Sequence, residues 1–382
     1  MKKSRKDIQQ DILMFILRPL VYIWMWFDAK RKVIKDPKFS FRRKEPYIIL
    51  ANHTYLFDVV HVPLRLRKVP FIIASQTLFT KQPTKFLVTQ VAHVISKSKG
   101  RSDTAAIMKI FSVVKKGYPI LIFPEGDTTF YGETGYIEES TMKLIKKLKL
   151  DVVTCNIRGG YSSRPRWGVG KRSRHFLEFK YKMSIPKDEL EKMSLSEINE
   201  VIKNELYHND YEYQRTAMVP HKGKQLAEGL ENVVYVCPHC QAINSIVTHG
   251  NTFHCSACEK EGSIDKYGFI HDFVFDNLVD WNKYQLQFTD KLRQSKIQSE
   301  GCLSYMKIES YEQVEVGRVG IEYSEGKIAF SGALNKEILI SEITKPTITL
   351  RRDLGFIYND KNYFLNLDKY SASLLRILQN KY

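Results

Sequence analysis

The sequence contains few cysteines, six among 382 residues, and their distribution excludes one class of protein. Four of them form two Cys-x-x-Cys pairs, which leaves only Cys155 and Cys302. A small secreted domain held by disulfides needs several cysteines spread along the chain. We therefore expect no disulfide framework, and we interpret Cys155, which lies in an apolar run, as a core residue rather than a nucleophile.

Acidic residues are scarce relative to basic ones. The chain has 42 Asp and Glu against 59 Lys and Arg, a formal net charge of +17. Such an excess favours an anionic partner, either nucleic acid or an anionic membrane surface. Internal repeats and low-complexity segments are not apparent, and the length suits two or three domains.

A long uninterrupted apolar run is also missing near the N-terminus. The apolar stretch 12–27 is shorter than the roughly 20 residues of a membrane-spanning helix, and Arg18-Pro19 interrupts it. Trp24 and Trp26 favour a lipid interface, and basic clusters flank the stretch. We interpret residues 1–45 as an interfacial anchor on anionic lipid. A signal peptide, a tilted spanning helix and a helix that covers the domain's own core are the alternatives.

Strand-like and helix-like patterns alternate over residues 46–185. Apolar runs at 47–51, 70–75 and 119–123 read as buried strands, and helical patterns such as 104–116 lie between such runs. This alternation predicts an α/β fold, a mostly parallel sheet with flanking helices.

His53 follows the first of these strands, and Asp58 comes five positions later. On a regular helix such a pair would be roughly 140° apart, so the side chains can meet only if His53 precedes a helix that begins near it. The carboxylate would then fix the imidazole tautomer and leave the other nitrogen free to accept a proton from a hydroxyl. The spacing alone also fits a structural histidine at a helix start.

A second motif makes the pattern specific. The run at 119–123 leads into Pro124-Glu125-Gly126, at the strand end where open α/β sheets carry their sites. The segments Asn-His-x-x-x-x-Asp and Phe-Pro-Glu-Gly, in this order, resemble those of the PlsC-like glycerophospholipid acyltransferases, the 1-acylglycerol-3-phosphate acyltransferases. The resemblance covers residues 46–183 and implies the glycerol-3-phosphate acyltransferase-like fold.

This resemblance implies acyl transfer from acyl-CoA or acyl carrier protein to a lysophospholipid hydroxyl. His53 would be the general base, oriented by Asp58, while Glu125 and Gly126 would shape the acceptor site. The family's phosphate-binding arginine is replaced in register by Lys97, with Arg101 close by; a lysine binds phosphate as a point charge rather than as a fork.

The segment after Gly126 departs from the family pattern beside the expected phosphate pocket. Where the family continues with Thr-Arg-Ser, this chain has Asp127-Thr128-Thr129. This segment has lost a cation and gained an anion relative to the family, so the sequence does not decide which lysolipid is the acceptor.

The four paired cysteines indicate a zinc ribbon. Cys237, Cys240, Cys255 and Cys258 form two pairs separated by fourteen residues, the spacing of two zinc knuckles across a hairpin. Four thiolates leave no open coordination position, so we expect structural Zn²⁺. A redox Cys-x-x-Cys is the alternative. Zinc thiolates imply a reducing compartment, hence the cytoplasmic face of a membrane.

The sequence after the acyltransferase-like region predicts a linker and two further domains. We interpret residues 186–232 as a helical linker, 233–265 as the zinc ribbon and 300–382 as a small β-rich domain. Several strands followed by one closing helix resemble a pleckstrin-homology-like barrel.

Together these patterns predict a membrane-associated enzyme that converts 1-acylglycerol-3-phosphate to phosphatidic acid. One alternative is a catalytically degenerate scaffold that binds lipid. The other is a nucleic-acid-binding zinc-ribbon protein, which is disfavoured because the ribbon carries few basic residues and the positive clusters gather near the apolar N-terminal stretch.

Overall fold

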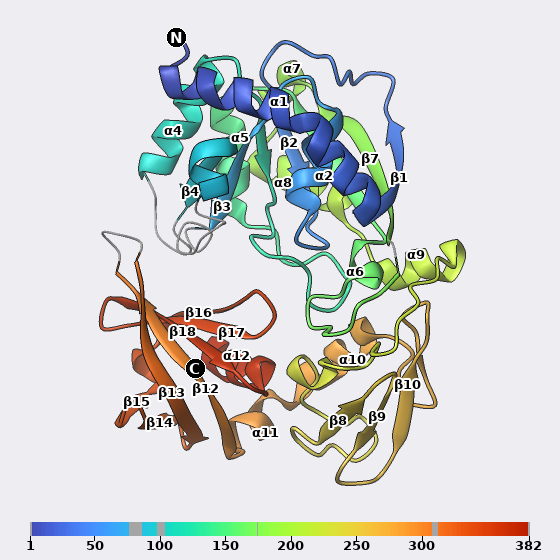
Figure 1. The fold of residues 1–382 in the computed structure, drawn as a ribbon, viewed down its shortest axis with the longest axis vertical. Coiled ribbons are helices and arrows are strands. Elements are labelled where there is room, and N and C mark those ends of the chain that lie inside the picture. The colour runs from blue at the N-terminus through green and yellow to red at the C-terminus, as the bar shows by residue number, and fades with distance from the viewer. Residues whose placement is uncertain (1, 76–85, 98–103, 174, 308–311, 381–382) are drawn as a thin grey trace. The chain divides into compact units, whose positions relative to one another are not determined.

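The computed structural model of the chain describes residues 2–75, 86–97, 104–173, 175–307 and 312–380. The chain divides into two compact units (Figure 1). The first comprises residues 1–164 and 174–219, and the second comprises residues 165–173 and 220–382.

The first unit is built on a seven-stranded sheet in the order β1-β7-β6-β2-β5-β3-β4. Every neighbouring pair is parallel except β6 and β7, which are antiparallel. The prediction of a mostly parallel sheet is therefore confirmed. The strands are β1 (Ala29–Lys35), β2 (Ile48–Ala51), β3 (Phe71–Ser75), β4 (Val94–Lys97), β5 (Ile120–Ile122), β6 (Val152–Arg158) and β7 (His175–Ile185).

Both faces of this sheet are buried, which explains why its central strands are apolar without alternation. In β2, Ile48 and Leu50 join one hydrophobic cluster, while Ile49 and Ala51 join another on the opposite face. The helices and single turns of the unit are α1 (Arg5–Asp28), α2 (Asp58–His61), η1 (Val62–Arg65), η3 (Leu87–Val91), α4 (Thr104–Lys115), α5 (Glu139–Leu148), α6 (Gly160–Ser163), α7 (Lys187–Leu190), α8 (Leu195–Leu206) and α9 (Asp210–Ala217).

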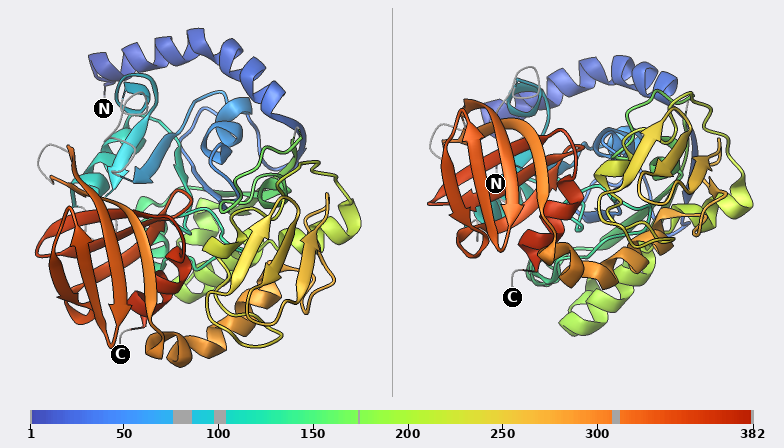
Figure 2. Two further views of the ribbon diagram at one scale, coloured as in Figure 1. Left: turned by 60° about the horizontal axis from the view of Figure 1, so that its bottom comes forward. Right: turned by 90° about the horizontal axis from the view of Figure 1, so that it is seen from below.

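Helix α1 turns a polar stripe toward its own domain, and it lies along the outside of the unit in both views of Figure 2. Lys116 Nζ lies 2.5 Å from Asp7, Gln10 donates to the carbonyls of Thr89 and Ala92, and Arg18 donates to those of Leu64 and Leu66. Large apolar side chains elsewhere on the helix are exposed instead: Ile8, Ile12, Phe15, Ile16, Leu20, Ile23, Trp26 and Phe27. By length and composition the helix could cross a membrane.

Two boundaries differ from the division drawn from the sequence. Residues 29–35, which the sequence grouped with the anchor, form β1 and pair in parallel with β7. Residues 195–206, interpreted as part of a linker, form α8 and bury Ile198, Ile202 and Leu206 in the cluster beneath the sheet. An apolar stripe at this spacing packs against the core because leaving it in water would cost free energy.

The second unit contains the cysteine-rich sheet, a four-stranded antiparallel sheet in the order β11-β10-β9-β8. Its elements are η4 (Leu230–Asn232), β8 (Ile246–His249), β9 (Thr252–Cys255), β10 (Glu261–Ile264), β11 (Ile270–His271), α10 (Leu278–Gln285), η5 (Leu286–Phe288) and α11 (Thr289–Gln294). The β8–β9 hairpin links the two cysteine pairs, and its second strand ends at Cys255.

A second sheet of this unit has seven antiparallel strands in the order β15-β14-β13-β12-β18-β17-β16. The elements are β12 (Ile297–Met306), β13 (Gln313–Ser324), β14 (Lys327–Gly332), β15 (Lys336–Leu339), η6 (Ile340–Glu342), β16 (Thr344–Thr349), β17 (Asp353–Tyr358), β18 (Lys361–Leu367) and α12 (Ser371–Gln379). The strands curl and α12 follows the last of them (Figure 2). The pleckstrin-homology-like assignment stays a prediction.

Candidate active site

The two motif residues that follow strands lie at one edge of the sheet. His53 comes two positions after β2, and Glu125 comes three positions after β5, and these two strands are parallel neighbours. The carboxyl ends of parallel strands share an edge, which is where open α/β sheets form their sites. The fold therefore brings together residues that are 72 positions apart in the chain, with Glu125 Oε1 2.7 Å from the His53 amide nitrogen.

His53 and Asp58 meet directly. His53 Nδ1 lies 3.1 Å from Asp58 Oδ2, and α2 begins at Asp58, so His53 stands outside the helix as the geometry requires. Asp58 is fully buried, and its carboxylate also accepts the amides of Thr54 and Tyr55 at 2.6 and 2.9 Å. A carboxylate held this firmly fixes the orientation of the imidazole and leaves Nε2 for chemistry.

Glu125 ties the turn that carries His53 to a second loop. One carboxylate oxygen accepts the His53 amide and the other accepts the Gly135 amide at 2.6 Å. Burial raises the pKa of Glu125 to about 7, against the lowering effect of these two amides. The side chain therefore positions the main chain of His53, a role that the sequence alone did not indicate.

The other predicted substrate residues have less defined positions. Gly126 is exposed, with φ +74°, and an added Cβ would meet nothing within 4 Å. Lys97 is the last residue of β4. Arg101 lies outside the described residues.

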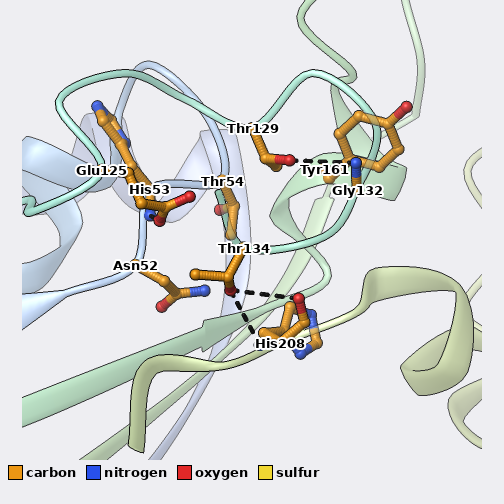
Figure 3. Close-up of a pocket in the computed structure, with 9 residues that line it drawn as sticks. All are labelled: Asn52, His53, Thr54, Glu125, Thr129, Gly132, Thr134, Tyr161 and His208. Atoms are coloured by element: carbon orange, nitrogen blue, oxygen red, sulfur yellow. Dashed lines mark hydrogen bonds between the residues drawn. The ribbon is translucent and has the colours of Figure 1, made fainter. Parts of the chain in front are cut away.

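A small pocket adjoins the turn that carries His53 and contains residues that the sequence did not single out (Figure 3). The imidazole of His53 points away from this space, whereas polar side chains from later loops border it. The lining residues are Asn52, His53, Thr54, Glu125, Thr129, Gly132, Thr134, Tyr161 and His208.

Several hydrogen bonds between side chains and the main chain hold these loops together. Asn52 accepts from the Ile157 amide at 2.7 Å and donates to the Ile157 carbonyl at 2.8 Å, which joins the ends of β2 and β6. His208 Nε2 lies 2.6 Å from Asp210 Oδ1, and Asp210 also accepts the amides of Gly159 and Ser162. Burial alone would raise the pKa of Asp210, but these partners hold it below its usual value.

Gly160 permits the close approach of α6 to the same turn. A Cβ at this position would lie 1.9 Å from Thr54 Oγ1 and 2.7 Å from Thr54 Cβ. Thr54 in turn donates to Asp58, so a displaced Thr54 disturbs the carboxylate that orients His53.

We expect Gly160→Ala to lower the free energy of unfolding by about 3 kcal/mol, because the turn must shift to admit the methyl group. Thermal or urea unfolding measures the loss. Gly126→Ala is the control, since it meets open space and carries only the cost of a positive φ, about 1 kcal/mol. Equal losses in the two variants would contradict the tight approach.

The four paired cysteines form the candidate metal centre of the second unit. Their sulfur atoms all lie within 4.8 Å of one another, with Cys240–Cys255 at 3.6 Å and Cys237–Cys258 at 4.0 Å. Tetrahedral zinc with Zn–S bonds of about 2.3 Å separates neighbouring sulfurs by about 3.8 Å. The residues therefore fit Zn²⁺, and no open position is left for catalysis.

Main-chain amides also favour thiolates at this centre. Burial raises the pKa of the Cys237 thiol to about 12, and the amides of Cys240 and His239 act against it. At Cys255 burial is outweighed by the Ser245 hydroxyl and the amides of Ala257 and Cys258, which lower the pKa to about 6. Hydrogen bonds to an anionic sulfur stabilise it, and zinc requires the deprotonated thiol.

Comparisons with known proteins agree with the motifs. The acyltransferase family model matches residues 32–158. A 1-acyl-sn-glycerol-3-phosphate acyltransferase of Borreliella burgdorferi is 29% identical over 134 residues, 35% of this chain and 53% of that protein. The chain thus spans about half the length of this curated relative.

A solved structure gives a weaker similarity. The 1-acyl-sn-glycerophosphate acyltransferase PlsC from Thermotoga maritima matches with a TM-score of 0.39 and 16% identity, over 53% of this chain and 84% of that chain. This likeness is too low to carry an argument. The family model covers the region that holds both motifs, so residues 32–158 of this chain are similar to an acyltransferase domain.

Proposed function

We propose that this protein transfers a fatty acyl group from a thioester of CoA or acyl carrier protein to the free hydroxyl of a lysophospholipid. The observation that carries the proposal is the contact between His53 Nδ1 and the buried Asp58, inside the region matched by the acyltransferase family. The expected acceptor is 1-acylglycerol-3-phosphate, which the named relative's activity supports. The product is then phosphatidic acid.

The reaction needs a base and no protein nucleophile. His53 Nε2 takes the proton of the acceptor hydroxyl, and the hydroxyl oxygen attacks the carbonyl carbon of the thioester. The new C–O bond forms, the C–S bond breaks, and the proton passes to the leaving thiolate. Asp58 keeps Nδ1 protonated and stabilises the imidazolium that forms.

The acceptor phosphate needs cations near this edge of the sheet. Lys97 ends β4, and in the PlsC-like pattern its position is that of the phosphate-binding residue. We assign Lys97 and Arg101 to the phosphate, with Gly126 bordering the acceptor. Glu125 then acts by holding the main chain of His53.

The exposed apolar side chains of α1 support membrane association. Asp7, Gln10 and Arg18 attach its polar stripe to the domain, and the apolar side chains face outward. A helix that crossed the bilayer would lose these contacts, whereas a helix in the membrane plane keeps them. We therefore assign α1 as an in-plane helix on the cytoplasmic face, in keeping with zinc thiolates and the basic charge.

We expect the double variant Phe15→Glu/Leu20→Glu to weaken binding to phosphatidylglycerol vesicles by about 100-fold or more, because each buried side chain contributes about 1.5–3 kcal/mol. Both side chains are exposed, at 78% and 64%, so the melting temperature should not change. Co-sedimentation with vesicles measures the binding. Leu350→Glu, an exposed leucine of the second unit at 66%, is the matched control. Equal loss in the control would contradict a role of α1.

Acyl transfer by the purified full chain in mixed micelles tests the proposed reaction. Palmitoyl-CoA and palmitoyl-acyl carrier protein are offered separately against a panel of lysophospholipids, and the products are identified by mass spectrometry. Phosphatidic acid from 1-acylglycerol-3-phosphate is the expected product. If neither donor gives product with any acceptor while the chain still binds lysolipid, the protein is a lipid-binding scaffold instead.

A further inference from the structure

The last turn of α1 touches the segment that carries His53 and Asp58. The rings of Trp24 and Phe57 pack edge to face with centroids 5.2 Å apart. One turn later, Asp28 ends the helix with its carboxylate 7% exposed. The helix that we assign to the membrane surface therefore contacts the neighbours of Asp58 in the chain.

Asp28 holds two side chains with a single oxygen. Its Oδ2 accepts the hydroxyl of Tyr55 at 2.7 Å and lies 3.1 Å from His61 Nε2. His61 Nδ1 has no hydrogen-bond partner among the residues that the structure describes, so the ring proton belongs on Nε2, where it is donated to Asp28.

The two partners of Asp28 lie on either side of Asp58. Tyr55 precedes Asp58 by three positions, and its amide donates to the same Asp58 oxygen that meets His53. His61 follows Asp58 by three positions and ends α2. Asp28 thus fixes both ends of the short segment whose middle orients the catalytic histidine.

Asp28 is placed to act as an anion. Burial alone would raise its pKa, but the hydrogen bonds from His61 and Tyr55 hold the pKa of Asp28 below its usual value. Arg164 Nη2 lies 3.6 Å from the other carboxylate oxygen. A buried carboxylate is stabilised only by such partners, and removal of one of them releases the others.

We propose that Asp28 is a positioning residue for the His53–Asp58 pair, through Tyr55 and His61, so that the catalytic geometry depends on how the end of α1 is seated. The inference rests on the proposed acyl transfer for its meaning and on the contacts around Asp28 for its support. It assigns to α1 a second role besides holding the chain at a lipid surface.

A double-mutant cycle tests this coupling. We expect Asp28→Asn and Tyr55→Phe each to lower kcat about tenfold with KM unchanged, since each weakens a hydrogen bond to a charged group. Because both act through one contact, the double variant should lose little more than either single variant. Asp7→Asn is the control: it removes the ion pair with Lys116 at the other end of α1 and should keep kcat. Additive losses, or an equal loss in Asp7→Asn, would overturn the proposal.

A second readout needs no substrate. Diethyl pyrocarbonate modifies the free imidazole nitrogen, and peptide mass spectrometry follows His53 alone. We expect a several-fold faster reaction of His53 in Asp28→Asn and Tyr55→Phe than in Asp7→Asn, because the ring is no longer held. If the wild-type chain transfers no acyl group and these rates still rise, the proposed function fails while the positioning role stands. If the chain is active and neither kcat nor the rate changes, the positioning role alone fails.

Discussion

Replacement of His53 by alanine is expected to lower kcat for acyl transfer by about 1000-fold or more, since a positioned general base contributes about 100- to 10,000-fold. The structure gives this side chain a defined task. Its Nδ1 is 3.1 Å from a fully buried carboxylate, its main-chain amide is held by Glu125, and its ring lies 4.3 Å from that of Phe123, centroid to centroid. These contacts fix the ring and leave Nε2 to accept a proton.

Asp58→Asn should lower kcat by about 100-fold through the same pair, because an amide no longer stabilises the imidazolium. The binding of lysolipid should persist in both variants, so the loss should appear in kcat rather than in KM. Initial rates across a range of acceptor concentrations separate the two constants.

His271 offers a matched control for these variants. It forms a similar pair, with Nε2 2.9 Å from Asp265, but the pair is exposed and belongs to the second unit. His271→Ala should keep full activity and the wild-type melting temperature. A wild-type rate in His53→Ala would remove the catalytic assignment, and an equal loss in His271→Ala would show that the effect is not specific.

The central strands of the first unit, such as β2 and β5, could be predicted because each is a continuous apolar run. The edge strand β1 could not, because its sequence is largely basic. A strand buried on both faces needs no alternation, so Ile48, Ile49 and Leu50 indicate it directly. For His53 and Asp58 the spacing gave a condition rather than a prediction: the side chains can meet only if the histidine precedes the helix. The structure fulfils this condition, since α2 begins at Asp58.

The role of Glu125 and the surroundings of His208 could not be predicted in this way. Their partners lie far away in the sequence, and the register between loops is set by tertiary packing rather than by local preference. One local signal was present, however. Ser194 and Glu197 form a capping box, and Ile198, Ile202 and Leu206 make an apolar stripe at helical spacing. Such a helix indicates a packed element rather than a linker, and His208 follows it directly.

Which side of α1 faces the domain could not be predicted from the sequence either. Composition alone shows a segment apolar enough for a membrane, and it leaves open whether the segment spans a membrane, lies flat on it or covers the domain's own core. Only the contacts of Asp7, Gln10 and Arg18 with the domain identify the inner side of the helix, and these partners come from distant parts of the chain. The apolar side of the helix can be recognised in the sequence. The contacts that distinguish a spanning helix from one in the membrane plane cannot.

Removal of zinc is expected to unfold the cysteine-rich sheet of the second unit. Four strands of two to four residues, β8 to β11, bury too few side chains to be stable alone. Structural zinc contributes about 10–16 kcal/mol in zinc-finger peptides at pH 7, about as much as the whole stability of a typical domain. Purified chain should contain one zinc ion, and a strong chelator should abolish one of two calorimetric transitions.

Cys255→Ser should have the same effect without a chelator, because it removes one of the four ligands, whose sulfur lies 3.6 Å from that of Cys240. Cys302→Ser is the matched control: Cys302 is exposed and lies outside the cluster, so zinc content and both transitions should be retained. The His53 site belongs entirely to the first unit, so acyl transfer in micelles should survive the loss of zinc. Wild-type zinc content in Cys255→Ser would refute the four-cysteine centre, whereas loss of acyl transfer with zinc would show that the ribbon also supports the catalytic unit.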